Sequence, residues 1–148
     1  MQLGDAGERL RMRAHERRIE GQHARLDEVA QGVYQTLDKE GASAAINDFL
    51  LYAAATEAHM ALEEEVTFPR LHGLRPDFDR ALARLVSDHE AMRRKLEDIK
   101  LRLKSGDALG ARFAFEAFAR SLERHEAFEE ELLAHVSEGP VTALSQPD

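Results

Sequence analysis

Two copies of one pattern of histidine and glutamate residues lie 66 positions apart in this sequence. Each copy has a histidine, a second histidine 36 residues later (23 to 59, and 89 to 125), and a glutamate four residues after that. The six residues are His23, His59, Glu63, His89, His125 and Glu129. Imidazole and carboxylate together are the ligand mix of non-heme iron and related metals, and residues four apart share a helix face. The pattern therefore predicts a metal site, provided that the fold brings the six side chains together.

The composition limits the class of protein. The chain has 148 residues, of which 43% are hydrophobic and 32% charged, and its net charge is −8. This length suits one domain with a modest core, and the abundance of Ala, Leu, Glu and Arg favours helix over strand. The acidic balance argues against nucleic-acid binding. The absence of cysteine excludes disulfides, thiolate metal sites and Fe–S clusters.

Neither a secretion signal nor a membrane span is predicted. Residues 1–13 carry charges where a signal peptide needs an apolar run, and no stretch has the roughly 20 apolar residues of a transmembrane helix. We therefore expect a cytoplasmic protein that does not bind membranes. The sequence leaves open whether it is a monomer or a dimer.

Glycine and proline divide the chain into four segments of helical length with apolar residues at helical spacing. The predicted helices are residues 17–39, 43–68, 76–104 and 107–136, with Ser43 and Asp107 as capping residues. Short connections favour antiparallel neighbours. The expected fold is all-α, an up-down-up-down four-helix bundle over residues 17–137. Residues 1–16 are predicted to be an N-terminal arm or helical extension, and residues 138–148 a flexible tail.

Helix geometry predicts that the six residues face inward at one height. At 100° per residue, each histidine lies within the apolar stripe of its helix, with Glu63 beside His59 and Glu129 beside His125. The next glutamates are expected to face water: Glu64, Glu65, Glu130 and Glu131. Counted from the turns at roughly 1.5 Å per residue, the four histidines agree in height within about 3 Å.

Such a buried layer of imidazoles and carboxylates is costly without a metal, because unpaired buried charges cost several kcal/mol each. Two metals bridged by carboxylate suit the mixed ligand set, with iron preferred and manganese or zinc possible. The structural alternative is a set of four satisfied core histidines with two ordinary His–Glu pairs four residues apart.

The stretch around His59 carries a family signature. It reads His59-Met-Ala-Leu-Glu63-Glu64, followed by Phe68-Pro69, and resembles the H-x3-E-E…F-P motif of the hemerythrin-like (HHE cation-binding) family. The stretch from His125 to Glu130 is similar to the fourth-helix counterpart, with Ala134-His135 where Phe-Pro would follow. The resemblance covers residues 17–136.

The resemblance implies a non-heme diiron centre, with two bridging carboxylates and an oxo or hydroxo bridge. Carried over, His23 and His59 would ligate one iron and His89 and His125 the other. Glu63 and Glu129 would then bridge the two ions. The ligand or substrate implied is O2, or another small molecule such as nitric oxide or peroxide.

Two departures from the oxygen carriers of this family bear on function. The carriers have a fifth histidine four residues from another on the third helix, whereas His89 has Arg93 and Leu85 at those positions. Their fourth-helix carboxylate is an aspartate five residues on, whereas Glu129 follows His125 by four. These departures favour a redox or sensing role over reversible oxygen carriage. An enzyme of this kind would be a diiron oxidoreductase, peroxidase- or oxidase-like.

Other functions remain open from the sequence. The chain could be a non-enzymatic iron-binding or iron-sensing bundle that acts through a partner, or a plain interaction bundle without metal. A ferritin-like oxidase needs two inward Glu-x-x-His motifs, and this chain has only Glu20-x-x-His23.

Several polar residues near the pattern have more than one possible role. Asp27 could be a further ligand, could pair with its repeat mate Arg93, or could lie in solvent at the edge of the stripe. Tyr34 and Tyr52 could be hydrogen-bonding or redox groups beside the metals, or ordinary core residues. The remaining histidines are expected at the surface: His15, His72 and His135.

Overall fold

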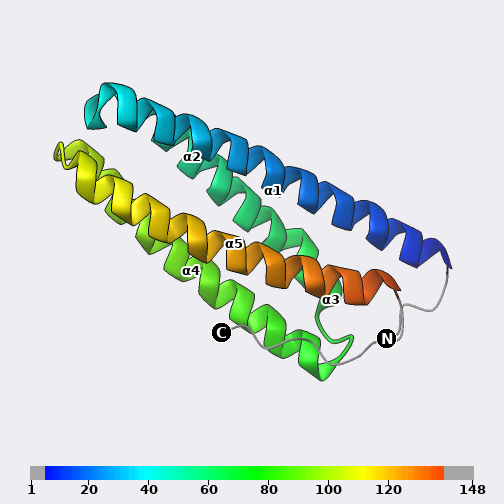
Figure 1. Cartoon of the computed structure of the whole chain (residues 1–148). Coiled ribbons are helices and arrows are strands. Elements are labelled where there is room, and N and C mark those ends of the chain that lie inside the picture. Colours follow the sequence, from blue (N-terminus) through cyan, green and yellow to red (C-terminus); the bar gives the residue numbers. More distant parts are fainter. Residues whose placement is uncertain (1–5, 139–148) are drawn as a thin grey trace.

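The structure is a computed structural model that describes residues 6–138, and the described residues are almost entirely helical (Figure 1). The long helices are α1 (Ala6–Glu40), α2 (Ala42–Leu62), α4 (Pro76–Lys104) and α5 (Ala108–Glu138). A π-helical turn, η1 (Glu63–Thr67), and the short α3 (Phe68–Leu71) continue from α2. The all-α prediction is therefore confirmed.

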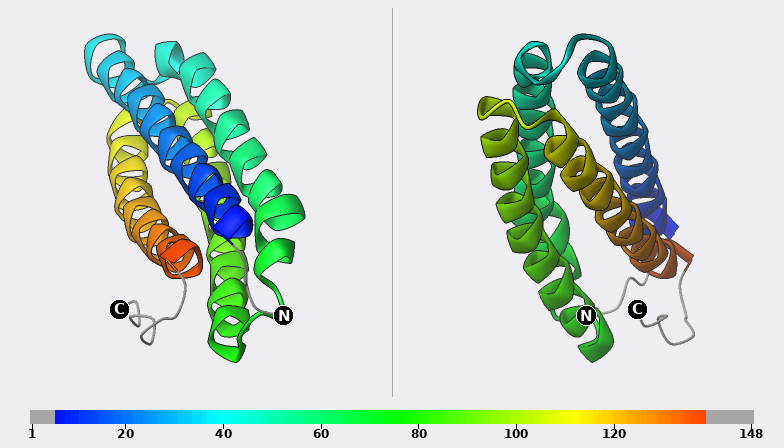
Figure 2. Two further views of the ribbon diagram at one scale, coloured as in Figure 1. Left: turned by 90° about the vertical axis from the view of Figure 1, so that its right-hand side faces the viewer. Right: turned by 60° about the vertical axis from the view of Figure 1, so that its left-hand side comes forward.

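The four long helices pack as a bundle. α1 and α4 each lie against both α2 and α5, as the views in Figures 1 and 2 also show. The connections are short, and Gly41 alone joins α1 to α2, with a φ of 93° that favours glycine. The capping position of α2 is occupied by Gly41, so the prediction of Ser43 as its cap is wrong. Asp107 caps α5 as predicted, because its side chain accepts a 2.9 Å hydrogen bond from the Gly110 amide. Within residues 6–138, no helix is both long and apolar enough to cross a membrane.

The first helix begins well before residue 17. Residues 6–16 are its first turns, while residues 1–5 of the predicted arm and 139–148 of the predicted tail lie outside the described residues. This extension packs on the bundle, because Met12 and His15 are buried. His15 Nε2 lies 2.8 Å from Thr67 Oγ1 in η1, so its predicted surface position is wrong. The domain boundaries at residues 17 and 137 stay predictions.

The apolar core has two parts, and the predicted metal residues lie between them. One part contains Met92, with Tyr52 and Phe115 stacked at a ring-centroid distance of 5.3 Å, and the other contains Leu85. On α4, His89 lies between Leu85 and Met92, and His23 on α1 and His125 on α5 likewise lie between residues of the two parts. Tyr34 also packs on Phe115, at 4.6 Å. The fold therefore surrounds a polar layer with apolar side chains above and below.

Candidate metal centre

The structure brings all six predicted residues into one buried layer. The inner ring nitrogens meet in pairs: His23 Nε2 lies 3.1 Å from His59 Nε2, and His89 Nε2 lies 3.1 Å from His125 Nε2. All six side chains are buried, and Glu63 and Glu129 are 0% exposed. The first pair comes from α1 and α2 and the second from α4 and α5, so every long helix contributes to the layer.

Each glutamate lies between the two histidine pairs. Glu63 Oε1 is 3.4 Å from His59 Nε2 and 3.3 Å from His89 Nε2. In the same way, Glu129 Oε1 is 3.3 Å from His23 Nε2 and its Oε2 is 3.6 Å from His125 Nε2. Two groups of four ligand atoms result, each with all atoms within 4.8 Å of one another, and both groups share Glu63 and Glu129. This is an arrangement that can hold two cations bridged by two carboxylates.

The polar atoms of the layer fit metal ions. Within residues 6–138, none of the four carboxylate oxygens of Glu63 and Glu129 has a hydrogen-bond partner, although all four are buried. Buried polar groups without partners are rare in proteins, and unpaired buried charges cost several kcal/mol. Two divalent cations would satisfy these oxygens and the inner nitrogens together. The donor set therefore fits the two ions that the resemblance implies.

Without a metal, the layer retains protons. Burial raises the pKa of Glu63, and the nearby charge of Glu129 raises it further. Burial would also raise the pKa of Glu129, but its close contacts with Glu63, His125 and His23 outweigh burial and lower it. For His23, burial opposes the charged form, yet contacts with Glu129 and nearby carboxylates give a net rise in its pKa.

Two repeat-related histidines differ in charge because of their outer partners. His59 Nδ1 lies 2.7 Å from Gln22 Oε1, and burial lowers the pKa of His59 to about 4. His125 Nδ1 lies 3.1 Å from Asp88 Oδ2. Burial again opposes the charged form of His125, but Asp88 and Glu129 outweigh it and raise its pKa to about 9. The neutral amide of Gln22 therefore contacts the His59 ring, and the carboxylate of Asp88 contacts the His125 ring.

Metal binding is expected to release protons at pH 7. Glu63, with its pKa raised to about 12, and His125, with its pKa raised to about 9, hold protons at this pH which a metal must displace. The raised pKa of His23 acts in the same direction. The affinity should therefore rise with pH through about 9, the pKa of His125, and keep rising above it, because Glu63 still holds its proton there. Calorimetric titration with Zn²⁺ at several pH values, in buffers of different ionisation enthalpy, measures both effects. An affinity independent of pH, with no proton release, would contradict this account.

The outer nitrogens of the other two histidines face carboxylates that sequence reasoning placed in water. His89 Nδ1 lies 3.1 Å from Glu64 Oε1, and His23 Nδ1 lies 3.6 Å from Glu130 Oε1. Both glutamates are partly buried, so the prediction that they face water is wrong. Each follows an inward glutamate by one residue and thus lies about 100° around the helix, where it faces the adjacent helix. Glu64 and Glu130 are 66 positions apart, and this spacing was the feature of the sequence that could have indicated their shared role.

The internal repeat therefore extends to the outer contacts. Gln22 and Asp88 are 66 positions apart and hold equivalent histidines, as do Glu64 and Glu130. Outer partners of this kind fix the tautomer and orientation of a metal-binding imidazole and raise its basicity.

Arg93 secures one of these outer contacts. Its guanidinium donates to Glu64 at 2.9 Å and to Glu57 at 2.8 Å. The alternative in which Arg93 forms an ion pair with Asp27 is therefore wrong, because the described partners of Arg93 are these two glutamates. Asp27 is exposed and belongs to neither group of candidate ligands.

Glu126 is a further buried acid that sequence reasoning missed. It is 8% exposed, its Oε2 lies 3.5 Å from His23 Nδ1, and its Oε1 has no hydrogen-bond partner among the described residues. Burial raises the pKa of Glu126 to about 7. Its repeat mate is the apolar Met60, so repeat symmetry gave no signal for it.

Comparison with known proteins agrees with this geometry. The family model described as the hemerythrin HHE cation-binding domain matches residues 14–136, a range that includes all six residues of the layer. Searches of curated proteins and of solved structures gave no match. The resemblance seen in the sequence is thereby confirmed over most of the chain. The protein belongs to the hemerythrin HHE cation-binding domain family.

Proposed function

We propose that this protein holds two iron ions and binds or reacts with O2, peroxide or nitric oxide, in a redox or sensing role. One observation supports the proposal above all: each buried glutamate lies 3.3–3.6 Å from a histidine of each pair. His23 and His59 would hold one ion and His89 and His125 the other, with Glu63 and Glu129 shared. The mixed nitrogen and oxygen donors suit iron, while manganese or zinc also fit them.

The bundle topology belongs to the same proposal. An antiparallel up-down-up-down arrangement is supported by the short connections between the long helices. It is supported also by the contacts of His23 with His59 and of His89 with His125 across consecutive helices.

The ligand count favours redox or sensing chemistry over reversible oxygen carriage. Each pair of histidines shares the same two glutamates, so each ion would have four protein ligands and open positions. Arg93 occupies the position of the carriers' fifth histidine, and its guanidinium is engaged with Glu57 and Glu64. Bound iron would supply electrons and positions for a small ligand. The chain's own part is to orient the imidazoles through Gln22, Asp88 and Glu64, and to exclude water with the two apolar clusters.

The proposal is tested by adding O2 to the reduced, iron-loaded protein and following visible absorption. We expect the iron to become oxidised promptly, without a species from which O2 can be recovered. A stable adduct that releases O2 under vacuum and oxidises only slowly would contradict the redox role and favour carriage.

An iron-sensing bundle is the second candidate. The unpartnered oxygens of Glu63 and Glu129 favour it, because burying them without metal lowers the stability of the folded protein. The stability of the fold would then depend on whether the metal sites are filled. A sensor of this kind would pass the change to a separate partner.

A further inference from the structure

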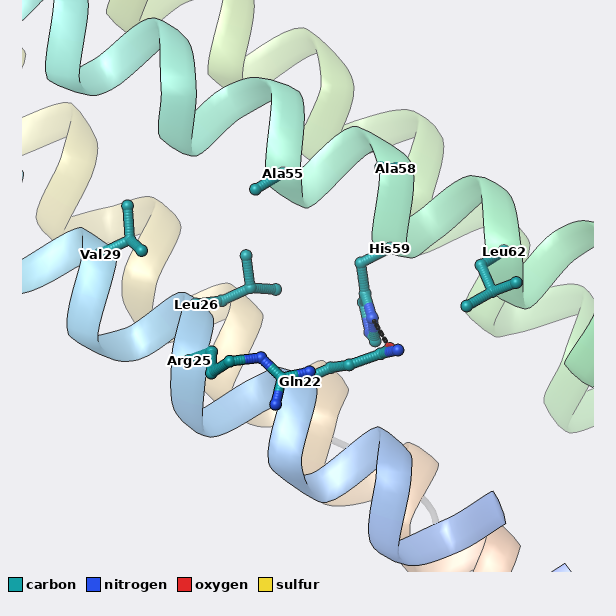
Figure 3. Close-up of a pocket in the computed structure, with 8 residues that line it drawn as sticks. All are labelled: Gln22, Arg25, Leu26, Val29, Ala55, Ala58, His59 and Leu62. Carbon is teal, nitrogen blue, oxygen red and sulfur yellow. Dashed lines mark hydrogen bonds between the residues drawn. The ribbon is translucent and has the colours of Figure 1, made fainter.

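A groove between α1 and α2 ends at His59, on the outside of the polar layer (Figure 3). Its volume is about 360 Å³, and five of the eight described residues that line it are small or apolar, among them Leu26, Val29 and Ala55. The other three are Gln22, Arg25 and His59. His59, at 8%, is the most exposed of the six candidate ligands. In Figure 3 its ring and the Leu26 side chain project between the two helices. The groove therefore approaches the layer on its His23 and His59 side.

The internal repeat provides a second groove for comparison, between α4 and α5, which ends at His125. Its volume is about 190 Å³. At the positions of Val29, Ala55 and Ala58 it has three polar or charged residues: Lys95, Ser121 and Arg124. Lys95 Nζ donates to Ser121 Oγ at 2.9 Å, and Arg124 lies 3.4 Å from the same oxygen. One polar contact, from Lys95 on α4 to Ser121 on α5, thus crosses the α4/α5 groove. The α1/α2 groove is mostly apolar, and among the described residues Arg25 is the one cationic residue in its lining.

This difference matters for the kind of molecule that each groove can admit. Small neutral molecules such as O2 and nitric oxide are weakly hydrated and favour apolar surroundings, whereas cationic side chains keep water or anions near them. We propose that the α1/α2 groove is the route by which small neutral ligands reach the layer, and that the α4/α5 groove is not. The identity of the ligand rests on the proposed function, but the route itself is a property of the protein without metal.

Leu26 is the side chain at the inner end of this route. It is 6% exposed and lies three residues after His23 on α1. Its repeat mate Met92 is 2% exposed and lines the α4/α5 groove. The two residues are both buried and occupy equivalent positions of the repeat, so their methyl groups report on access through each groove.

Dissolved O2 is paramagnetic and can serve as the probe. In the full-length protein without iron, we expect O2 to enhance the relaxation of the Leu26 methyl protons several-fold more than those of Met92. Ala55→Trp should remove this excess by filling the groove, and Val29→Trp should act in the same way. Ser121→Trp, at the position of Ala55 in the other groove, should leave it unchanged. Equal enhancement at Leu26 and Met92, or an Ala55→Trp protein that behaves like wild type, would overturn the proposal.

The iron-loaded protein gives a second measurement. Ala55→Trp should slow the reaction with O2 several-fold at unchanged iron content, and Ser121→Trp should not. Equal slowing by both variants, or by neither, would overturn the route. Failure of the wild-type chain to bind iron would instead refute the proposed function, and the relaxation measurement would still decide the route.

Discussion

Replacing Glu63 with alanine is expected to abolish binding of both metal ions rather than one. Glu63 Oε1 lies 3.4 Å from His59 Nε2 and 3.3 Å from His89 Nε2, so the carboxylate serves both histidine pairs. Loss of an outer partner alone weakens metal binding by roughly 10–100-fold, and loss of a shared ligand should exceed this for each ion. Metal content after purification, and titration with Zn²⁺, measure the effect.

Glu65→Ala is the matched control, because Glu65 lies two residues further on, is exposed, and carries the same charge. It should bind metal like the wild type. His59→Ala offers a second comparison, because His59 belongs to one pair only and its loss should affect one ion more than the other. A Glu63→Ala protein with unchanged affinity for two ions would show that Glu63 is not a shared ligand.

Removing the metal is expected to lower the thermal stability of the protein strongly. A ligand that binds only the folded state stabilises it by about 4 kcal/mol when its free concentration is about 1,000 times Kd. At about 2–4 °C per kcal/mol for a chain of this size, loss of two such ions should lower Tm by about 15–30 °C. The physical cause is the set of buried oxygens of Glu63 and Glu129, which the metal would satisfy. Helical circular dichroism, followed on heating with and without a chelator, gives this shift.

The same experiment separates the two candidate functions. A preorganised redox centre should keep its helices at room temperature after metal removal, whereas a sensor should also lose amide protection along α1 and α2. Glu63→Ala should melt at the same temperature with and without chelator. Identical melting of the wild-type protein in both conditions would mean that no metal stabilises the folded state.

The helices could be predicted because turn residues and apolar periodicity agree along this chain. The π-helical turn η1 could not, because periodicity arguments assume 3.6 residues per turn throughout. Leu62 follows His59 by three residues, a spacing that predicts an inward position, but it is 38% exposed and lines the α1/α2 groove just before η1. His15 was misplaced for a different reason, since its burial depends on η1 packing against the start of α1.

The candidate ligands were predictable because their repeat is long and exact in spacing. The residues that contact the outer nitrogens of the histidines could not be predicted in the same way. The periodicity of one helix indicates a single inward face, whereas each helix of the bundle contacts two neighbouring helices. Glu64 is such a case, bound between His89 of α4 and Arg93 one turn further along. The metal-binding roles of the six residues stay a proposal that their convergence supports.

The most direct test of that proposal is elemental analysis of the protein purified from iron-replete cells. We predict two iron ions per chain in the wild-type protein and in Glu65→Ala, and none in Glu63→Ala. Folded protein that contains no metal after purification and binds none on titration with Fe²⁺, Mn²⁺ or Zn²⁺ would contradict the account.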